Sequence, residues 1–237
     1  MTKPPVTSVI LDMDGLLIDT EPAWRAAEAD VFADLGIQLS AAELLETTGQ
    51  AIGEVVAIWR QRQPDQPGEL EQLTDTEIAD RITDLVVAHV KAEGAPMAGV
   101  PKAIELFRRR SLSLAIASSS PLRLIDAVCE QLGLDDIEVR CSAFDEANGK
   151  PAPDVYLAAA RKLGDSPASC LAIEDSPTGV LAAKAAGMRC LAVPDPQLAA
   201  DPRYREADLV ISSLEHLDDQ AFRLLCLPLA GEAGAGQ

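Results

Sequence analysis

The chain has 237 residues, which is enough for one large domain or two smaller ones with a substantial apolar core. Acidic residues outnumber basic residues 38 to 20, and the formal net charge is −18. This charge argues against binding to nucleic acid or to an anionic membrane surface, because both depend on basic side chains.

Six short apolar segments predict the strands of a sheet. They alternate with helical patterns, and each is apolar throughout, which is typical of parallel strands covered on both faces. The predicted strands are residues 6–11, 112–117, 139–143, 170–174, 189–193 and 208–212. We therefore expect an α/β fold, a doubly wound parallel sheet with a Rossmann-like core.

Three of the intervening helices have clear end signals. Ser120 precedes Pro121 and is predicted to cap a helix, and Ser176 before Pro177 predicts a second N-cap. Glycines are predicted to end the helix over 153–164 and the helix that begins at Ser176.

One long interval, about 20–94, contains amphipathic helical patterns and no strand candidate. Capping boxes are predicted at Ser40–Glu43 and Thr74–Glu77, and 60–69 is predicted to be a loop. The apolar stripe after the second box is predicted to contain Ile78, Ile82, Leu85, Val86 and His89. We therefore expect a catalytic core of residues 1–19 and 95–229, a small all-α cap domain of 20–94 inserted after the first strand, and a disordered tail over 230–237.

Polar side chains follow the predicted strands, and the carboxyl ends of parallel strands are where open α/β sheets bind ligands. The residues placed there are Asp12 and Asp14, the serines 118–120, Lys150, and the pair Glu174 and Asp175. Carboxylates that face one another need a positive partner, and Mg²⁺ is the common choice for oxygen ligands. A lysine, a serine and helix N-termini beside such an ion predict a phosphate pocket.

Other reactive residue types lack a pattern. The two histidines, His89 and His216, are far from any strand-end motif, so a Ser-His-Asp triad or a histidine zinc site is not supported. Asp19 is interpreted as a capping or hinge residue. The five cysteines show no metal spacing, and the first residues lack the apolar region of a signal peptide. Buried free thiols and a cytoplasmic location are the expectation.

These motifs, in this order, resemble those of the haloacid dehalogenase-like hydrolases. The resemblance rests on "DMDG", on the strand-end serine, on "GKPAPDVY" and on "IEDSPTGVLAAKAAG", and it covers nearly the whole chain. More narrowly, "LDMDGLLIDTEPAW" and "ASSSPL" are similar to segments of the bacterial phosphatases that act on 2-deoxyglucose 6-phosphate and hexitol phosphates.

The resemblance implies a Mg²⁺-dependent phosphatase of sugar or polyol phosphates, with a helical cap and an aspartyl-phosphate intermediate. It implies Asp12 as the nucleophile, Asp14 as the acid/base, Ser118 and Lys150 as phosphoryl-binding groups, and Asp175 as a magnesium ligand. The chemistry is consistent, because a charge-neutralised carboxylate can attack phosphorus and a second one can protonate the leaving oxygen. Further metal ligands are expected among the carboxylates of Asp12, Asp14 and Glu174.

The substrate is expected to be a small phosphorylated molecule, contacted also by Ser119, and the protein is expected to be a monomer. Glu21 and Trp24, next to the first crossing into the cap, are predicted to line the closed pocket. Ala51 stands where related phosphatases often have arginine, which leaves cap specificity open.

Three alternatives remain at this level. A phosphosugar mutase would use the same core, although the places where mutases have an assisting histidine and arginine hold Trp24 and the segment "GQAIGE". A haloacid dehalogenase would not need Asp14. A phospho-aspartate receiver, a signalling switch, also combines aspartate, Mg²⁺ and lysine, but it would be about half as long and would lack the helical insert.

Overall fold

The structure is a computed structural model, and it describes residues 4–47, 50–62 and 73–226. Its centre is a six-stranded sheet in the order β3-β2-β1-β4-β5-β6, in which every neighbouring pair is parallel. The strands are β1 (Ser8–Leu11), β2 (Ser113–Ser118), β3 (Val139–Ser142), β4 (Cys170–Glu174), β5 (Arg189–Ala192) and β6 (Leu209–Val210). The predicted doubly wound α/β fold is confirmed.

The largest difference from the predicted strands is at the edge of the sheet. β6 pairs only with β5 and at only two positions, so it spans two residues of the predicted 208–212. β1 begins at Ser8 instead of residue 6, where the register with β2 and β4 also begins.

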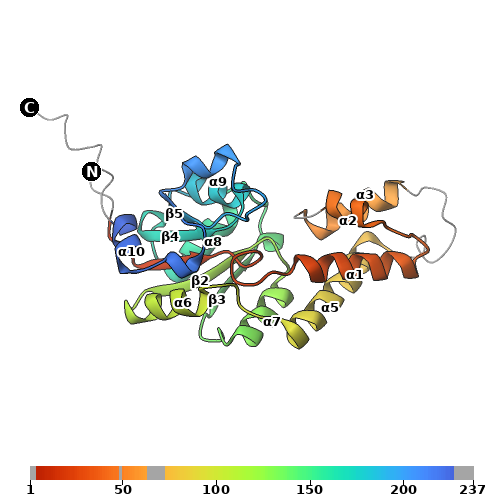
Figure 1. Cartoon of the computed structure of the whole chain (residues 1–237), viewed down its shortest axis with the longest axis horizontal. Helices are drawn as coiled ribbons and strands as arrows, with labels where there is room; N and C mark the ends of the chain where they lie inside the picture. Colours follow the sequence, from red (N-terminus) through yellow and green to blue (C-terminus); the bar gives the residue numbers. More distant parts are fainter. Residues whose placement is uncertain (1–3, 48–49, 63–72, 227–237) are drawn as a thin grey trace, which may run out of the picture.

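Both faces of the sheet are covered by helices (Figure 1). Along β1, Val9 and Leu11 belong to one apolar cluster and Ile10 to the other, as expected for a strand buried on both sides. The first cluster includes side chains of α6 (Val100–Arg109), α7 (Leu122–Leu132) and α10 (Asp219–Cys226). The second includes side chains of α8 (Asp154–Leu163) and α9 (Pro177–Ala185).

Between β1 and α6, the regular elements that the structure describes are all helices. It contains α1 (Glu21–Asp34), α2 (Ala41–Glu46), α3 (Ile52–Arg62) and α5 (Asp75–Glu93), which lie beside the sheet in Figure 1. The chain enters and leaves this group at one place, because Ile18 pairs with Pro96 and the Met97 amide donates to the Leu17 carbonyl at 2.9 Å. We propose that these helices are the cap domain predicted for residues 20–94, with 1–19 and 95–229 as the core.

Several helix ends follow the sequence signals. Both capping boxes are present, Ser176 caps α9 by accepting from the Gly179 amide, and Gly164 ends α8 in the left-handed conformation. α9 ends at Ala185, two residues before Gly187. The prediction for Ser120 is wrong, because Pro121 is the N-cap of α7 and the Ser120 hydroxyl donates to Asp14 at 2.8 Å instead.

Two predictions within the helical interval are corrected. The buried stripe of α5 is Ile78, Ile82, Val86 and Val90 with Thr83, whereas Leu85 and His89 are exposed, because an exact i, i+4 repeat favours the former set. The predicted loop over 60–69 is wrong at its start, since α3 continues to Arg62; residues 63–69 lie outside the described ranges, as does the predicted tail 230–237.

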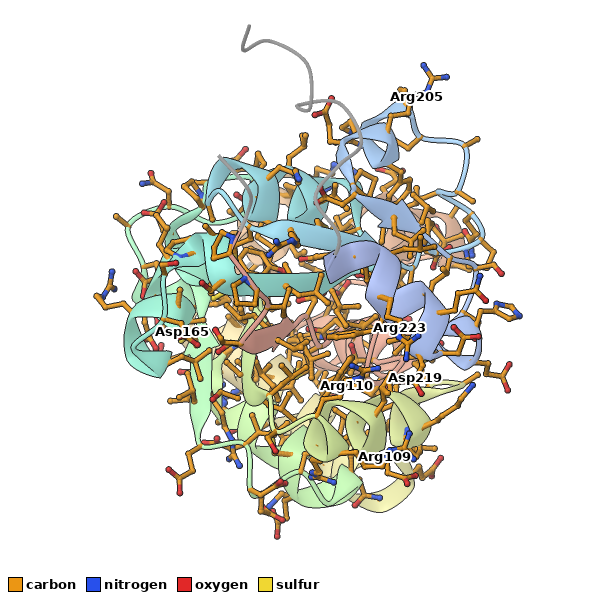
Figure 2. The ribbon with its side chains drawn as sticks, turned by 90° about the vertical axis from the view of Figure 1, so that its left-hand side faces the viewer. Arg109, Arg110, Asp165, Arg205, Asp219 and Arg223 are labelled. Atoms are coloured by element: carbon orange, nitrogen blue, oxygen red, sulfur yellow. The ribbon has the colours of Figure 1, made fainter. Side chains whose placement is uncertain are left out.

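At the end of the sheet opposite the helical insert, an exposed ion pair links α10 to the end of α6. Figure 2 shows Arg110, after α6, beside Asp219 at the start of α10, and the two side chains form an ion pair.

The four cysteines whose side chains are described, Cys129, Cys141, Cys170 and Cys190, are free and buried. None of the described helices has the length and apolar character needed to cross a bilayer.

Candidate active site

The site lies where the strand order reverses. β1 is hydrogen bonded to β2 on one side and to β4 on the other, and in such sheets ligands bind at this switch point beyond the carboxyl ends. Asp12 directly follows β1, and its backbone amide donates to the Ile173 carbonyl of β4 at 3.0 Å. The topology therefore places Asp12 next to the end of β4, where Glu174 and Asp175 stand.

Three buried carboxylates meet at this point. One oxygen each of Asp12, Glu174 and Asp175 lies within 4.8 Å of the others. The buried Lys150 ammonium donates to Asp12 Oδ1 at 2.7 Å and to Glu174 Oε1 at 2.6 Å. A single lysine thus faces three acids, as the strand-end argument anticipated for these four residues.

Two glycines make room for the carboxylates. A Cβ on Gly15 would lie 2.1 Å from Asp175 Oδ2, and Gly15 also has a φ of +78°, which disfavours any side chain. A Cβ on Gly179, in the first turn of α9, would lie 1.8 Å from Glu174 Oε1. The backbone therefore approaches both acids as closely as glycine permits.

Glu174 has all of its described hydrogen bonds within the site. Its Oε1 accepts from Lys150 and, at 2.6 Å, from the buried Tyr156 hydroxyl, while its Oε2 accepts from the amide and hydroxyl of Ser176 at 3.3 and 3.1 Å. The sequence analysis did not identify Tyr156 as part of the site, although "KPAPDVY" contains it. Both carboxylate oxygens of Glu174 therefore already accept hydrogen bonds. This arrangement suits Glu174 for orienting Lys150 more than for binding a further ligand directly.

The excess of acid raises the affinity of the carboxylates for protons. Burial, followed by the nearby Glu174 charge, raises the pKa of Asp12 to about 7, although Lys150 opposes the change. Burial, followed by Asp12 and Glu174, raises the pKa of Asp175 to about 9. For Lys150, burial lowers the pKa, but Asp12 and Glu174 outweigh it and leave the pKa raised. The site therefore lacks positive charge.

A divalent cation fits this deficit. Among the described residues, Asp175 Oδ1 is buried and accepts no hydrogen bond, which is costly for a carboxylate without another partner. The Tyr204 hydroxyl donates to the Asp175 carbonyl and fixes the backbone behind it. An all-oxygen donor set of buried carboxylates suits a hard cation of the Mg²⁺ type.

Asp14 lies outside the three-carboxylate cluster. Its Oδ1 accepts from the Thr20 hydroxyl at 2.5 Å, and its Oδ2 accepts from the hydroxyls of Ser118 and Ser120 at 3.0 and 2.8 Å. The structure thus brings Ser118 to Asp14 rather than to Lys150. Ser120 was placed at this edge from the sequence, but its role was assigned to a helix cap and not to Asp14. Thr20 is a site residue that the sequence reasoning missed, and no local pattern marks it.

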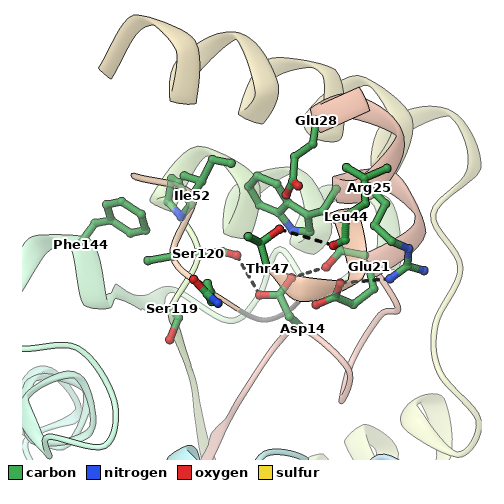
Figure 3. A pocket seen from close by; sticks show the side chains of 15 residues that line it. Asp14, Glu21, Arg25, Glu28, Leu44, Thr47, Ile52, Ser119, Ser120 and Phe144 are labelled. Atoms are coloured by element: carbon green, nitrogen blue, oxygen red, sulfur yellow. Dashed lines mark hydrogen bonds and ion pairs between the residues drawn. The ribbon is translucent and has the colours of Figure 1, made fainter. Parts of the chain in front are cut away.

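A pocket extends from Asp14 to the helical insert (Figure 3). Its core side is formed by Asp14, the exposed Ser119, Ser120 and Phe144, and its far side by residues of α1, α2 and α3. Glu21, Trp24 and Ala51, which were named from the sequence, are all in its lining. Asp19 is not; its carboxylate accepts from the Glu21 amide at 3.2 Å, at the start of α1.

The pocket also contains a side chain that the sequence analysis overlooked. Glu28 of α1 lies in the lining together with Arg25 and Thr47, and Glu28 is only 6% exposed. The sequence contains a sign that Glu28 is buried. It is four residues after Trp24 and four before Phe32, which places it within the apolar stripe of α1. His216, the other histidine named from the sequence besides His89, is also exposed.

The comparisons with known proteins agree with this geometry. The model of a hydrolase family, the haloacid dehalogenase-like hydrolases, matches residues 6–187. The chain is 40% identical to hexitol phosphatase B of Escherichia coli (strain K12) over 218 residues, which covers 91% of this chain and 96% of that protein.

Two solved structures illustrate the similarity in three dimensions. A mutant of CbbY from Rhodobacter sphaeroides, in complex with xylulose-(1,5)bisphosphate, superposes with a TM-score of 0.78 and is 30% identical; the match covers 90% of this chain and 96% of that one. A β-phosphoglucomutase from Clostridium difficile has a TM-score of 0.74 at 20% identity, over 93% and 96% of the two chains, which shows a shared fold alone.

Proposed function

Since this chain belongs to the haloacid dehalogenase-like hydrolase family and is a phosphatase of that family, we propose that it hydrolyses small sugar or polyol phosphates through an aspartyl-phosphate intermediate with the help of Mg²⁺. The observation that carries this proposal is the cluster of Asp12, Glu174 and Asp175 around Lys150, next to Asp14. The similarity to a hexitol phosphatase supports the substrate class.

Asp12 is the nucleophile in this proposal. It stands at the switch point of the sheet, and Lys150 holds one of its oxygens. The free oxygen attacks phosphorus in line with the leaving alcohol, which forms an acyl phosphate on Asp12 and releases the alcohol. Water then attacks the same phosphorus and restores the carboxylate, so that the net reaction is ester plus water to alcohol plus phosphate.

Asp14 is the proton carrier. It lies two residues after Asp12, and three hydroxyls hold its carboxylate toward the pocket. In the first step the protonated Asp14 donates to the leaving oxygen, and in the second it accepts a proton from the attacking water. To do so, Asp14 exchanges one of its hydroxyl partners for the leaving oxygen when substrate binds.

Lys150 and Ser118 stabilise the charge of the transferring phosphoryl group in this proposal. The ammonium lies beside the nucleophile, where its charge is little screened because it is buried. Glu174 and Tyr156 position it from behind. Ser119, exposed in the pocket, is placed to contact the phosphate or the first hydroxyl of the alcohol.

Asp12 and Asp175, with Glu174 beside them, would hold the magnesium ion. When bound, the ion supplies positive charge to the phosphoryl oxygens and to the nucleophile, which the carboxylates would otherwise repel. The deficit of positive charge described above supports this assignment. The chain's own contribution is to bury the acids and to fix them with Gly15, Gly179 and Tyr204.

The test is hydrolysis of a hexitol phosphate and of p-nitrophenyl phosphate. We expect activity with Mg²⁺, loss of activity after chelation, and recovery when Mg²⁺ is restored. Full activity after verified removal of divalent metal would contradict the metal assignment, and no phosphate release from any phosphomonoester would contradict the function. The receiver alternative does not apply to a member of this hydrolase family, and the 40% identity with a hexitol phosphatase, against 20% with the β-phosphoglucomutase, favours the phosphatase over the mutase.

A further inference from the structure

Glu28 is a buried acid for which the proposed reaction has no use. It projects from α1 into the pocket of Figure 3, and the residue is 94% buried, since 6% of its surface is exposed. Among the residues that the structure describes, its Oε2 has no hydrogen-bond partner. An acceptor in this situation loses its water without compensation, so a structural reason for keeping it is lacking.

The surroundings of Glu28 make its charge more costly. Glu21, which is also on α1 and lines the same pocket, carries the same charge as Glu28. Arg25, the cation nearby, forms an ion pair with Glu21 at 3.3 Å. Burial, followed by repulsion from Glu21, raises the pKa of Glu28 to about 7, although a hydrogen bond with the Thr47 side chain and the charge of Arg25 oppose this. A cost of this kind is typical of groups that are retained for binding.

The charge of the lining limits what can bind. The described lining has three carboxylates, Asp14, Glu21 and Glu28, and one cation, Arg25. A second phosphate on the substrate would meet net negative charge there, whereas hydroxyl groups can donate to the carboxylates. The view in Figure 3 places Glu28 on the side of the pocket away from Asp14 and Ser119, where the end of the alcohol distant from the phosphate would lie.

We propose that Glu28 is a specificity residue that accepts a hydrogen bond from a hydroxyl of the leaving alcohol, so that the enzyme selects phosphate monoesters of neutral polyhydroxylated alcohols and rejects esters with a second anionic group. This inference rests on the proposed function, because it assumes that the phosphoryl group is bound at Asp12. It separates this chain from the CbbY structure described above, which holds a bisphosphate.

The test measures kcat/KM for three substrates in the wild type, in one isosteric variant and in a control variant. Glu28→Gln keeps the shape of the side chain and removes its charge, and Asp30→Asn removes one charge from an exposed position of the same helix as a matched control. The substrates are a hexitol phosphate, p-nitrophenyl phosphate, which has no hydroxyl to offer, and a hexose bisphosphate.

We expect Glu28→Gln to lower kcat/KM for the hexitol phosphate by about tenfold, mainly through KM, because a charge-assisted hydrogen bond is replaced by a weaker one to a neutral amide oxygen. Activity on p-nitrophenyl phosphate should stay within about twofold of the wild type, and the wild type should discriminate against the bisphosphate more strongly than the variant. Asp30→Asn should change none of these values.

Two results would overturn the inference. One is equal loss on both monoesters, or no loss on the hexitol phosphate, with the fold intact by circular dichroism. The other is a variant that is less stable than the wild type above pH 7, which would show that the contacts of Glu28 within the protein, such as that with Thr47, outweigh the cost of burying its charge. A wild type without phosphatase activity would instead refute the proposed function, so the two failures are distinguishable.

Discussion

Asp12 and Glu174, at the carboxyl ends of β1 and β4, and Glu28, on α1, are all buried, but their surroundings supply them with different numbers of hydrogen-bond donors. Asp12 and Glu174 share Lys150, and Glu174 has two further donors in Tyr156 and Ser176. Glu28 leaves one oxygen without a partner among the described residues. In our proposal, the first arrangement holds the catalytic groups in fixed positions before substrate arrives, and the second is completed by a hydroxyl of the substrate.

The largest expected effect is at the nucleophile. Asp12→Asn removes the attacking oxygen but keeps the shape of the side chain, and we expect kcat to fall on the order of 10⁴-fold or more. The measurement is single-turnover phosphate release at saturating hexitol phosphate. Residual activity within about tenfold of the wild type would mean that another group attacks phosphorus.

Lys150→Met tests whether the buried lysine stabilises both the fold and the reaction. It leaves Asp12 and Glu174 unpaired, so we expect a loss of about 3–5 kcal/mol in unfolding free energy and, where the protein stays folded, a loss on the order of 10²–10³ in kcat. The control is Lys91→Met, because Lys91 and Glu130 form an ion pair of similar length, 2.8 Å, on the surface. The control should lose far less stability, because solvent screens the exposed pair; equal losses would contradict the account.

Gly179→Ala tests whether the backbone must approach Glu174 this closely. The added Cβ would displace the carboxylate, and with it Lys150, so we expect kcat to fall by about 10²-fold while the fold persists. Gly149→Ala is the matched control, because nothing lies within 4 Å of its Cβ although it precedes Lys150. If both variants keep wild-type kcat, Glu174 is not a positioning group.

The smallest effect concerns stability and pH. The pKa of Glu28 is raised to about 7 in the folded protein from an ordinary 4.5, so its ionisation opposes folding. Below pH 4.5 the penalty is absent, it grows between pH 4.5 and 7, and it reaches up to about 3 kcal/mol above pH 7. Glu28→Gln should therefore be more stable than the wild type at pH 8, and chemical denaturation should show this advantage shrinking toward pH 4.5. A constant difference across this range would contradict the burial of an ionised Glu28.

The residues at the strand ends could be predicted from the sequence, because two general rules of parallel sheets determine where they lie. Apolar runs without alternation indicate buried parallel strands, and the acids that follow Leu11 and Ile173 must then lie on one edge of the sheet. Lys150 could be placed there because it precedes a helix in the same alternation. Capping boxes at Ser40 and Thr74 were predictable because the motif is local.

The missed residues depend on contacts distant in sequence. Tyr156 was not identified, and it reaches Glu174 eighteen residues away. Ser120 was placed at the right edge but given the wrong role, since it turns to Asp14 across 106 residues instead of capping its own helix. His89 was placed on the buried stripe because periodicity alone cannot say how wide a helix face is buried. Glu28 was overlooked because only the apolar residues of its helix stripe were considered, and the acid among them was not.

The central claim is that Asp12 receives the phosphoryl group, and acid-quenched protein mapped by peptide mass spectrometry tests it most directly. Asp14→Asn mixed with p-nitrophenyl phosphate and Mg²⁺ should accumulate a phosphorylated enzyme, because the activated leaving group needs no proton and the water step lacks its base. The phosphoryl group should lie on Asp12, and the reciprocal Asp12→Asn variant should acquire none. Phosphorylation of Asp14 in that second variant, together with an unmodified first one, would contradict the account.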